Sequence, residues 1–284
     1  MKKFFIVVTL VILSVVFFNS TVFAQDDTAD YLKMGYLLSQ KGEYSQAIDC
    51  YTSAINTNIK DIDVAYILRG IARVELKDFK GATNDFSKAI LINPKNYYPY
   101  AIRAWIKSQQ KDYKGAIKDY TEAINLDSSK EFLYFERGRN RYIMKDYTGA
   151  LIDCTNSLNT NPNYDAYVLR AGLRESMNDY EGSVKDLSSA IKIRDNVPVL
   201  YYQRACAYNH LEQYKYALQD FNKAIKLDPK YADAYYSRGL TKAMTKQTSK
   251  AMEDIEKAKD LYLEQNNLTK YEEVKSFINK LNNK

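Results

Sequence analysis

The stretch Ala232-Asp-Ala-Tyr-Tyr-Ser-Arg-Gly239, with Ala251 and Ala258 downstream, decides how this chain folds. Tyr235 and Gly239 are four residues apart, so they share one face of a predicted helix. Ala251 and Ala258 are seven apart and share one face of a second helix. Small side chains at Gly239 and Ala251 let the two helix axes approach closely. The stretch therefore predicts a helix-turn-helix unit.

The same pattern recurs along the chain. When Tyr235 is counted as position 4 of a unit, position 8 is always Gly or Ala, and positions 20 and 27 are always Ala or Ser. Position 17 is aromatic in six of the seven units. Position 4 is tyrosine in all of them, at intervals of 33 to 35 residues: Tyr31, Tyr66, Tyr100, Tyr134, Tyr167, Tyr201 and Tyr235. Such a period indicates a repeat array, in which each unit must stack on its neighbours to bury its apolar face.

On these residues the chain resembles the tetratricopeptide repeat family, whose period is 34 residues. The resemblance implies an all-α fold, a right-handed α-solenoid of seven helix-turn-helix repeats within residues 25–265. The expected repeats are 28–62, 63–96, 97–130, 131–163, 164–197, 198–231 and 232–265. Pro94, Pro162 and Pro229 follow three of the predicted second helices and prevent them from continuing.

Residues 266–284 predict one more helix. Thr269 and Glu272 have the spacing of a capping box, which would start it. Its apolar residues share one face: Tyr271, Val274, Phe277, Ile278 and Leu281. We interpret the segment as a capping helix over the last repeat, because the ends of solenoids need cover. A partner-binding or membrane-surface helix is the alternative.

Residues 1–24 have the pattern of an export signal. Lys2 and Lys3 precede a mostly apolar run from Phe4 to Phe18, and small residues follow up to Ala24. The run is short for a membrane span, which takes about 20 residues. We therefore expect an exported protein, periplasmic or secreted. An uncleaved N-terminal membrane anchor is the alternative.

Charge and cysteine content exclude several classes of function. The net charge is +6, or +4 after loss of the two lysines in residues 1–24, and no long basic run occurs, so a nucleic-acid partner is not indicated. Cys50, Cys154 and Cys206 lie in different repeats and predict small buried side chains rather than a disulfide framework. His210 is the single histidine, so a multi-histidine metal site is excluded. With neither a phosphate-binding loop nor Cys-pair metal spacing, we expect no cofactor and no enzymatic activity.

Arginine and aspartate occur together in six repeats. Position 7 is Arg in repeats 2 to 7 and position 23 is Asp in the same six, whereas repeat 1 has Met34 and Cys50. Residues that appear and vanish together indicate contact, so we predict an Arg–Asp pair between the two helices of each repeat. A ladder of arginines for an acidic ligand is the weaker alternative, because each arginine has a carboxylate available.

The family resemblance implies that positions 2, 5, 9, 12 and 13 of the first helices line a concave groove that binds peptides. Aromatic residues gather there in the middle of the array, and Trp and Tyr are favoured interface anchors. The residues predicted for this groove are Tyr98, Trp105, Phe132, Phe135, Arg139, Tyr142, Tyr202 and Tyr236. The alternative is that some of them pack between neighbouring first helices as an extension of the core.

The function predicted from this pattern is a non-catalytic protein–protein interaction scaffold whose groove holds a segment of a partner protein. The residues that some family members use to clamp chaperone C-termini are absent, because position 5 is apolar or aromatic in every repeat. Two alternatives stay open: a cell-envelope structural or assembly component that acts through its convex surface or self-association, and a glycan-binding protein whose aromatic residues stack on sugars. The sequence identifies neither the partner nor the oligomeric state.

Overall fold

A computed structural model describes residues 27–57 and 61–282. All regular secondary structure in these ranges is α-helical, so the predicted all-α class is confirmed. The expected export signal, residues 1–24, lies outside the described residues. Among the helices that are described, none combines the length and the apolar character needed to cross a membrane.

The described residues form seven consecutive helix pairs and one last helix. The pairs are α2 (Asp27–Gln40) with α3 (Tyr44–Asn56), α4 (Ile62–Glu75) with α5 (Phe79–Ile92), α6 (Tyr97–Gln109) with α7 (Tyr113–Leu126), α8 (Glu131–Ile143) with α9 (Tyr147–Thr160), α10 (Tyr164–Ser176) with α11 (Tyr180–Ile193), α12 (Pro198–His210) with α13 (Tyr214–Leu227), and α14 (Ala232–Met244) with α15 (Thr248–Glu264). The last helix is α16 (Leu268–Asn282).

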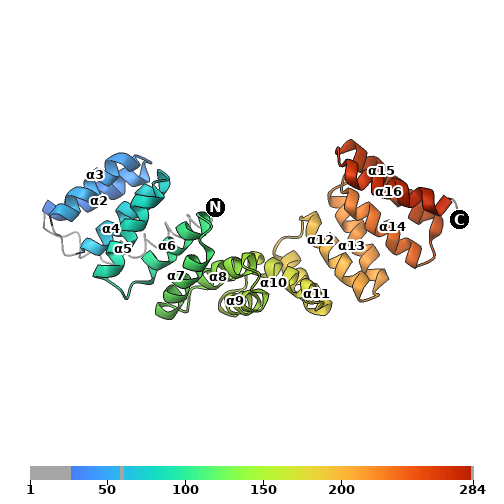
Figure 1. Ribbon diagram of the computed structural model, residues 1–284, viewed down its shortest axis with the longest axis horizontal. Coiled ribbons are helices and arrows are strands. Elements are labelled where there is room, and N and C mark those ends of the chain that lie inside the picture. The colour runs from blue at the N-terminus through green and yellow to red at the C-terminus, as the bar shows by residue number, and fades with distance from the viewer. Residues whose placement is uncertain (1–26, 58–60, 283–284) are drawn as a thin grey trace. The chain divides into compact units, whose positions relative to one another are not determined.

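The chain divides into two compact units, residues 1–129 and residues 130–284. The first unit contains α2 to α7 and the second contains α8 to α16. Within each unit every helix packs against the next one in sequence (Figure 1). The predicted helix-turn-helix repeat arrangement is therefore confirmed.

The turn between the two helices has one backbone form in all seven pairs. A residue with positive φ reverses the chain, and in the first pair it is Gly42, with φ of 80°. In the others a side chain is held in this left-handed conformation, with φ between 55° and 65°: Lys77, Lys111, Lys145, Asn178, Glu212 and Lys246. In four repeats the next residue is an aspartate that accepts a hydrogen bond from a glycine N–H three residues on, at 2.9–3.0 Å: Asp78, Asp112, Asp146 and Asp179. These aspartates cap the second helices.

The small residues at position 8 are required by close helix contact. A Cβ added to Gly70 would lie 2.9 Å from the ring of Phe86, and one added to Gly239 would lie 2.9 Å from the carbonyl oxygen of Ala251. Both distances are shorter than ordinary carbon contacts, so neither position has room for a side chain without movement of the neighbouring helix. The close approach predicted from the sequence is confirmed at these two positions.

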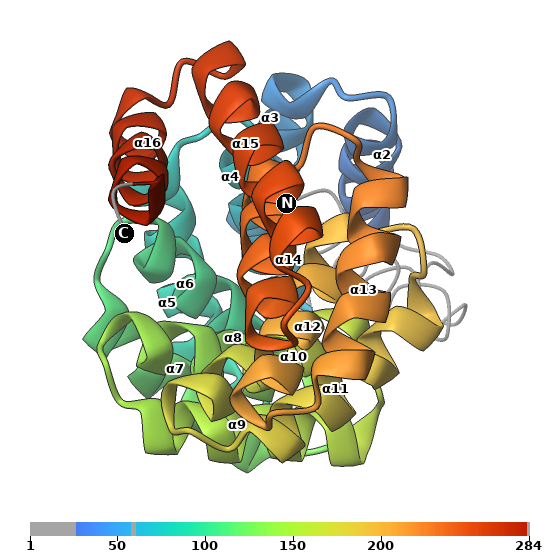
Figure 2. The ribbon, with the colours of Figure 1, turned by 90° about the vertical axis from the view of Figure 1, so that its right-hand side faces the viewer.

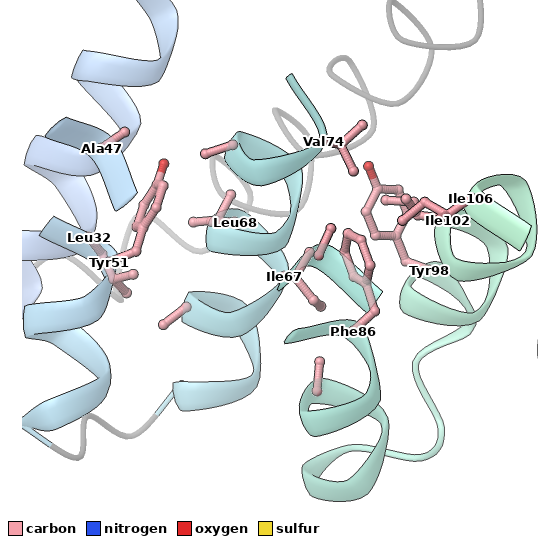
Figure 3. Packing of buried hydrophobic residues seen from close by; sticks show 14 of the residues in the cluster. Leu32, Ala47, Tyr51, Ile67, Leu68, Val74, Phe86, Tyr98, Ile102 and Ile106 are labelled. Carbon is pink, nitrogen blue, oxygen red and sulfur yellow. The ribbon is translucent and has the colours of Figure 1, made fainter. Parts of the chain in front are cut away.

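Each unit has an apolar interior built from its helix pairs. In the first unit Tyr51 and Phe86 are almost fully buried between the helices of their repeats. Figure 3 shows the ring of Tyr98 beside Val74, Ile102 and Ile106. The second unit has separate buried clusters, of which the largest surround Leu187 to Tyr201 and the α15–α16 contact.

Helix α16 covers the end of the second unit, as the capping-helix interpretation predicts. It lies beside α15 (Figure 2). Val274 and Ile278 are buried against the last repeat, and the ring centroid of Phe277 lies 6.4 Å from that of Tyr236. The predicted helix start was wrong by two residues: α16 begins at Leu268, and Asn267 caps it by accepting a hydrogen bond from the Lys270 N–H at 3.3 Å.

Candidate functional site

Each predicted Arg–Asp pair is present as a two-pronged contact. In repeat 2 Arg69 donates through Nε to one carboxylate oxygen of Asp85 at 3.1 Å and through Nη2 to the other at 2.8 Å. The same geometry joins Arg103 to Asp119, Arg137 to Asp153, Arg170 to Asp186, Arg204 to Asp220, and Arg238 to Asp254. All six aspartates are buried, so the pairs connect the first helix to the second inside each repeat.

A second cation joins five of these carboxylates, and the sequence interpretation missed it. In repeat 5 Arg174 donates to Asp186 at 2.9 Å, and in repeat 3 Lys107 lies 2.8 Å from Asp119. The other three are Arg73 on Asp85, Arg141 on Asp153, and Lys242 on Asp254. These cations occupy position 11, which is Arg or Lys in these five repeats and Tyr208 in repeat 6. A search for basic residues of either type at a fixed offset from the aspartate would have found them.

The position 7 arginines also connect neighbouring repeats. Arg170 uses its remaining nitrogen, Nη1, to donate to the hydroxyl of Thr155 in the preceding repeat at 3.2 Å. Equivalent bonds join Arg69 to Thr52, Arg103 to Ser87, and Arg204 to Ser188, and Arg238 bonds to the side-chain oxygen of Asn222. With its donors committed to the aspartate and to the previous repeat, the position 7 arginine is a packing residue. This geometry favours the pairing interpretation over a ligand-binding ladder.

The predicted groove residues of the first unit belong to its apolar interior. Tyr98 is 8% exposed and Trp105 is 9% exposed, and both lie in the hydrophobic cluster that includes Ile102 and Ile106. The Trp105 ring also meets the ring of Phe79 edge-on, with 6.3 Å between centroids. These contacts agree with the core-extension alternative for the two residues. Ligand binding by them stays a prediction.

The predicted groove residues on α8 are more accessible. Phe132 and Phe135 are half-buried, whereas Arg139 and Tyr142 are exposed. The guanidinium of Arg139 lies over the Phe135 ring, 5.9 Å from its centroid, and Nη1 donates to the Glu136 carboxylate at 3.1 Å. The Arg139 side chain is 53% exposed and that of Glu136 is 13% exposed, so the cation faces solvent from a mostly buried carboxylate. Burial raises the pKa of Glu136, and the adjacent Arg139 opposes that rise.

Further along the second unit, two predicted tyrosines take part in packing. Tyr202 lies between Phe221 and Tyr231, at centroid distances of 6.0 and 5.1 Å, and burial raises its pKa. Tyr236 contacts α16 through Phe277. Both are half-buried, so each keeps a face open to solvent. Their packing holds the first helices α12 and α14 to the elements behind them.

Gly172 on α10 faces open space. It is exposed, and a Cβ added to it would meet no atom within 4 Å. It occupies position 9, which is Arg139 in the preceding repeat and Cys206 in the following one. Val168, one turn earlier on α10, is half-buried. Arg139 on α8 thus presents a cation, Val168 on α10 presents an apolar side chain, and Gly172 on α10 faces open space.

The described residues also contain one histidine and three cysteines. The ring of His210 stacks on that of Tyr180 at 4.2 Å. Cys154 and Cys206 are free, and burial raises their thiol pKa values to about 12 and about 11, which leaves both protonated at neutral pH. Within the described residues, no group of three or more His, Cys, Asp or Glu side chains could hold a metal ion.

Comparison with known proteins agrees with this architecture. Models of the tetratricopeptide repeat match residues 31–58, 97–130, 198–231 and 221–253. A comparison with curated proteins gives no match. Among solved structures, YrrB, described as a TPR protein with an unusual peptide-binding site, is 25% identical and has a TM-score of 0.59, over 62% of this chain and 91% of YrrB.

Two further structures show the same fold at lower identity. A tetratricopeptide repeat protein from Parabacteroides merdae is 18% identical with a TM-score of 0.57, over 87% of this chain and 98% of its own. The C-terminal part of a TPR repeat-containing protein from Cytophaga hutchinsonii is 16% identical with a TM-score of 0.67, over 81% of this chain and 95% of its own. The repeated helix pairs and the family matches together show that this chain is a tetratricopeptide-repeat protein.

Proposed function

We propose that this protein is a non-catalytic scaffold that binds an extended segment of a partner protein on the first helices of residues 130–284. The repeats and their structural neighbours support an interaction scaffold in general. The observation that supports this location is the exposed guanidinium of Arg139, together with the open space at Gly172, which occupies the same position of the next repeat. In the first unit the corresponding aromatic residues, Tyr98 and Trp105, are buried.

The chemistry of α8 and α10 suits a peptide backbone. The Arg139 guanidinium can donate to a peptide carbonyl or to a carboxylate, which are the acceptors that a planar fork of N–H groups recognises best. Phe135 and Val168 offer apolar surface for a side chain of the bound segment. Tyr142, at the end of α8, is 45% exposed and can pack against a second side chain of that segment. YrrB, whose description includes a peptide-binding site, supports a peptide as the class of ligand.

The test fills the open space at Gly172 with a large side chain while keeping the fold. Gly172→Phe fills a position that has free space, so we expect the helix to be retained and the partner to be lost. Gly172→Ala is the matched control: it should keep the partner and stabilise α10 by about 0.5–1 kcal/mol, since Ala replaces Gly inside a helix. Arg139→Glu should also lose the partner. Each form would serve as bait in an extract of the source cells, with retained proteins identified by mass spectrometry and helicity checked by circular dichroism.

A protein retained by the parent and by Gly172→Ala, but lost from Gly172→Phe and Arg139→Glu, would support the proposal and identify the partner. Equal retention by all four forms would contradict it and move the interaction to the second helices or to the ends, as the structural-component alternative expects. Loss on addition of soluble glycan fragments would instead favour the glycan-binding alternative.

We also propose that the scaffold works after export, periplasmic or secreted. The support is the sequence of residues 1–24, with its basic start, apolar run and small residues before Gln25. Mass spectrometry of the N-terminus of the protein from source cells tests this. A chain that begins at Gln25 agrees with export, and one that keeps Met1 agrees with the anchored alternative.

A further inference from the structure

Helix α10 has acidic residues at both ends of the helix face on which Gly172 lies. The residues of this face are three, four and three positions apart, a spacing that keeps side chains on one side of a helix: Asp165, Val168, Gly172 and Glu175. We call these four residues the α10 face. Its carboxylates occupy positions 2 and 12, and no other first helix of residues 130–284 is acidic at both positions.

The Glu175 carboxylate lies close to the next first helix, α12. Burial raises the pKa of Glu175, and His210 on α12 opposes that rise. Burial also raises the pKa of the Cys206 thiol on α12, and the charge of Glu175 adds to the rise. The Glu175 side chain is half-buried, and within the described residues neither a hydrogen bond nor an ion pair engages it. It is therefore a partly desolvated carboxylate without a cation.

Cations near the α10 face are already committed to other carboxylates. Arg174 precedes Glu175 in the sequence, but its Nη1 donates to Asp186 at 2.9 Å. The acidic position 2 residue of repeat 7, Asp233, has Lys270 as its own partner. An opposite charge within about 4–6 Å stabilises the ionised form of a carboxylate. A ligand that brings a cation to Glu175 would supply what the protein itself does not.

The surroundings of Glu175 favour a long basic side chain over a small cation. Gly172, one turn earlier on α10, is exposed, and a Cβ added to it would meet no atom within 4 Å. Val168, one further turn away, is half-buried and apolar. Lysine and arginine lay their carbon stems along apolar surface and keep the charged end at a polar group. A stem over Gly172 would contact Val168 on one side and bring its charge toward Glu175 on the other.

We propose that the α10 face binds a lysine or arginine side chain of the partner segment, with the stem over Gly172 and the cation at the Glu175 carboxylate. This inference rests on the proposed function and names the chemistry of the segment that the scaffold holds. The exposed guanidinium of Arg139 on α8 repels a second cation, so the basic side chain is selected at α10 and not at α8.

The first test selects peptides from a library of random sequences displayed on phage. The purified parent protein should enrich peptides that contain Lys or Arg, relative to the unselected library. Glu175→Gln should lose this preference, and Glu175→Lys should enrich Asp or Glu instead. Glu253→Lys is the matched control, because it makes the same change of charge at an exposed position of the second helix α15, and it should keep the preference of the parent. Circular dichroism checks that each form is folded.

The second test measures the affinity of one selected peptide by fluorescence anisotropy. Replacement of its basic residue by Met should weaken binding about tenfold, and Glu175→Gln should do the same, because each removes one side of a charge-assisted contact. The two changes together should cost little more than one alone, since both remove the same interaction. A peptide with Glu in place of its basic residue should bind Glu175→Lys more tightly than it binds the parent.

The outcomes separate this inference from the proposed function. If the parent selects peptides without a basic preference and Gly172→Phe loses them, the inference is overturned and the partner site is retained. If the parent retains no peptide better than Gly172→Phe does, both are overturned. A basic preference that persists in Glu175→Gln would also overturn the inference, because it would assign the cation to another carboxylate, such as Asp165.

Discussion

Repeat 1 and repeat 5 have the same two helices and the same turn, but they use different side chains to join them. In repeat 5 Asp186 is buried and takes hydrogen bonds from Arg170 and Arg174, and Arg170 continues to Thr155 of the repeat before. Repeat 1 has Met34 where repeat 5 has Arg170, and Cys50 where it has Asp186. The difference shows that the charged cluster is not needed to form a helix pair. The cluster occurs in repeats that follow another repeat, to which its arginine can bond.

Repeat 6 lies between these two extremes. It keeps Arg204 and Asp220 but has Tyr208 in place of the second cation. The Arg204 guanidinium lies over the Tyr208 ring, 6.0 Å from its centroid. The ring thus occupies the space of the second cation without its charge. A stepwise loss of the cluster along one chain offers internal controls for each of its parts.

The largest expected effect comes from the loss of the shared carboxylate in repeat 5. Asp186→Ala leaves Arg170 and Arg174 without their buried acceptor, and removal of one partner from a buried ion pair costs about 3–5 kcal/mol. The midpoint of urea unfolding, followed by circular dichroism, measures it. Cys50→Ala in repeat 1 removes no ion pair, so it should move the midpoint of urea unfolding far less.

The triple variant Arg170→Met, Arg174→Leu and Asp186→Cys sharpens the same comparison. It gives repeat 5 the side chains that repeat 1 has at these three positions, Met34, Leu38 and Cys50. Since no buried charge is left unpaired, we expect it to be more stable than Asp186→Ala alone. A triple variant that is less stable than the single one would show that the cluster contributes more than the pairing of its own charges.

Thiol labelling compares the two kinds of repeat without mutation. Cys50 lies in repeat 1 and is partly exposed, whereas Cys154 is buried in α9 beside a complete charged cluster. Burial raises the pKa of both thiols, that of Cys154 to about 12. We expect iodoacetamide to modify Cys50 at least about tenfold faster, a ratio that corresponds to about 1.4 kcal/mol. Peptide mass spectrometry over a time course measures both rates. Equal rates would contradict the expectation that the first repeat protects its cysteine less than repeat 4 does.

The helix caps should give a smaller difference. Asp179 caps α11 through a hydrogen bond from the Gly182 N–H at 2.9 Å, whereas Gln213 precedes α13 and makes no such bond. Asp179→Ala should cost about 1 kcal/mol, the usual value for loss of an N-cap side chain. Gln213→Ala should change the unfolding free energy by only a few tenths of the loss expected for Asp179→Ala. Both follow from urea unfolding curves, and equal losses would assign the effect to something other than the cap.

The smallest expected change is at the contact between repeats. Thr155→Val keeps the shape of the side chain but removes the acceptor of the Arg170 Nη1 hydrogen bond. We expect a loss of about 0.5–1.5 kcal/mol, the net value of one hydrogen bond, in urea unfolding. Thr160→Val is the matched control, because the Thr160 hydroxyl bonds only to a backbone carbonyl of its own helix.

Much of this structure could be predicted because the repeat period fixes many positions at once. The Arg–Asp pairs were predictable from the loss of both residues in repeat 1. The second cation was missed because no single residue type fills position 11. The helix start at Asn267 was misplaced because Thr269 is also a good cap residue, and the spacing alone does not separate the two.

The accessibility of the predicted groove residues was the least predictable feature. Trp105 and Arg139 both occupy position 9, yet one is 9% exposed and the other has a side chain that is 53% exposed. Periodicity places both on the same helix face, but burial depends on what surrounds each of them in space. Phe79 and Ile102 surround Trp105, whereas the small residue Gly172 follows Arg139 at the same position of the next repeat.

The bond from arginine to the preceding hydroxyl has a consequence for how such a chain evolves. Each of repeats 2 and 5 contains both parts of the junction: the arginine that bonds backward, and a hydroxyl to which the following arginine donates, Ser87 or Ser188. Duplication or deletion of one such unit in the gene therefore recreates the same chemistry at every junction. An insertion or deletion of one or two residues between the arginine and the hydroxyl residue would move them out of register. Array length can thus change between descendants in whole units without any compensating substitution.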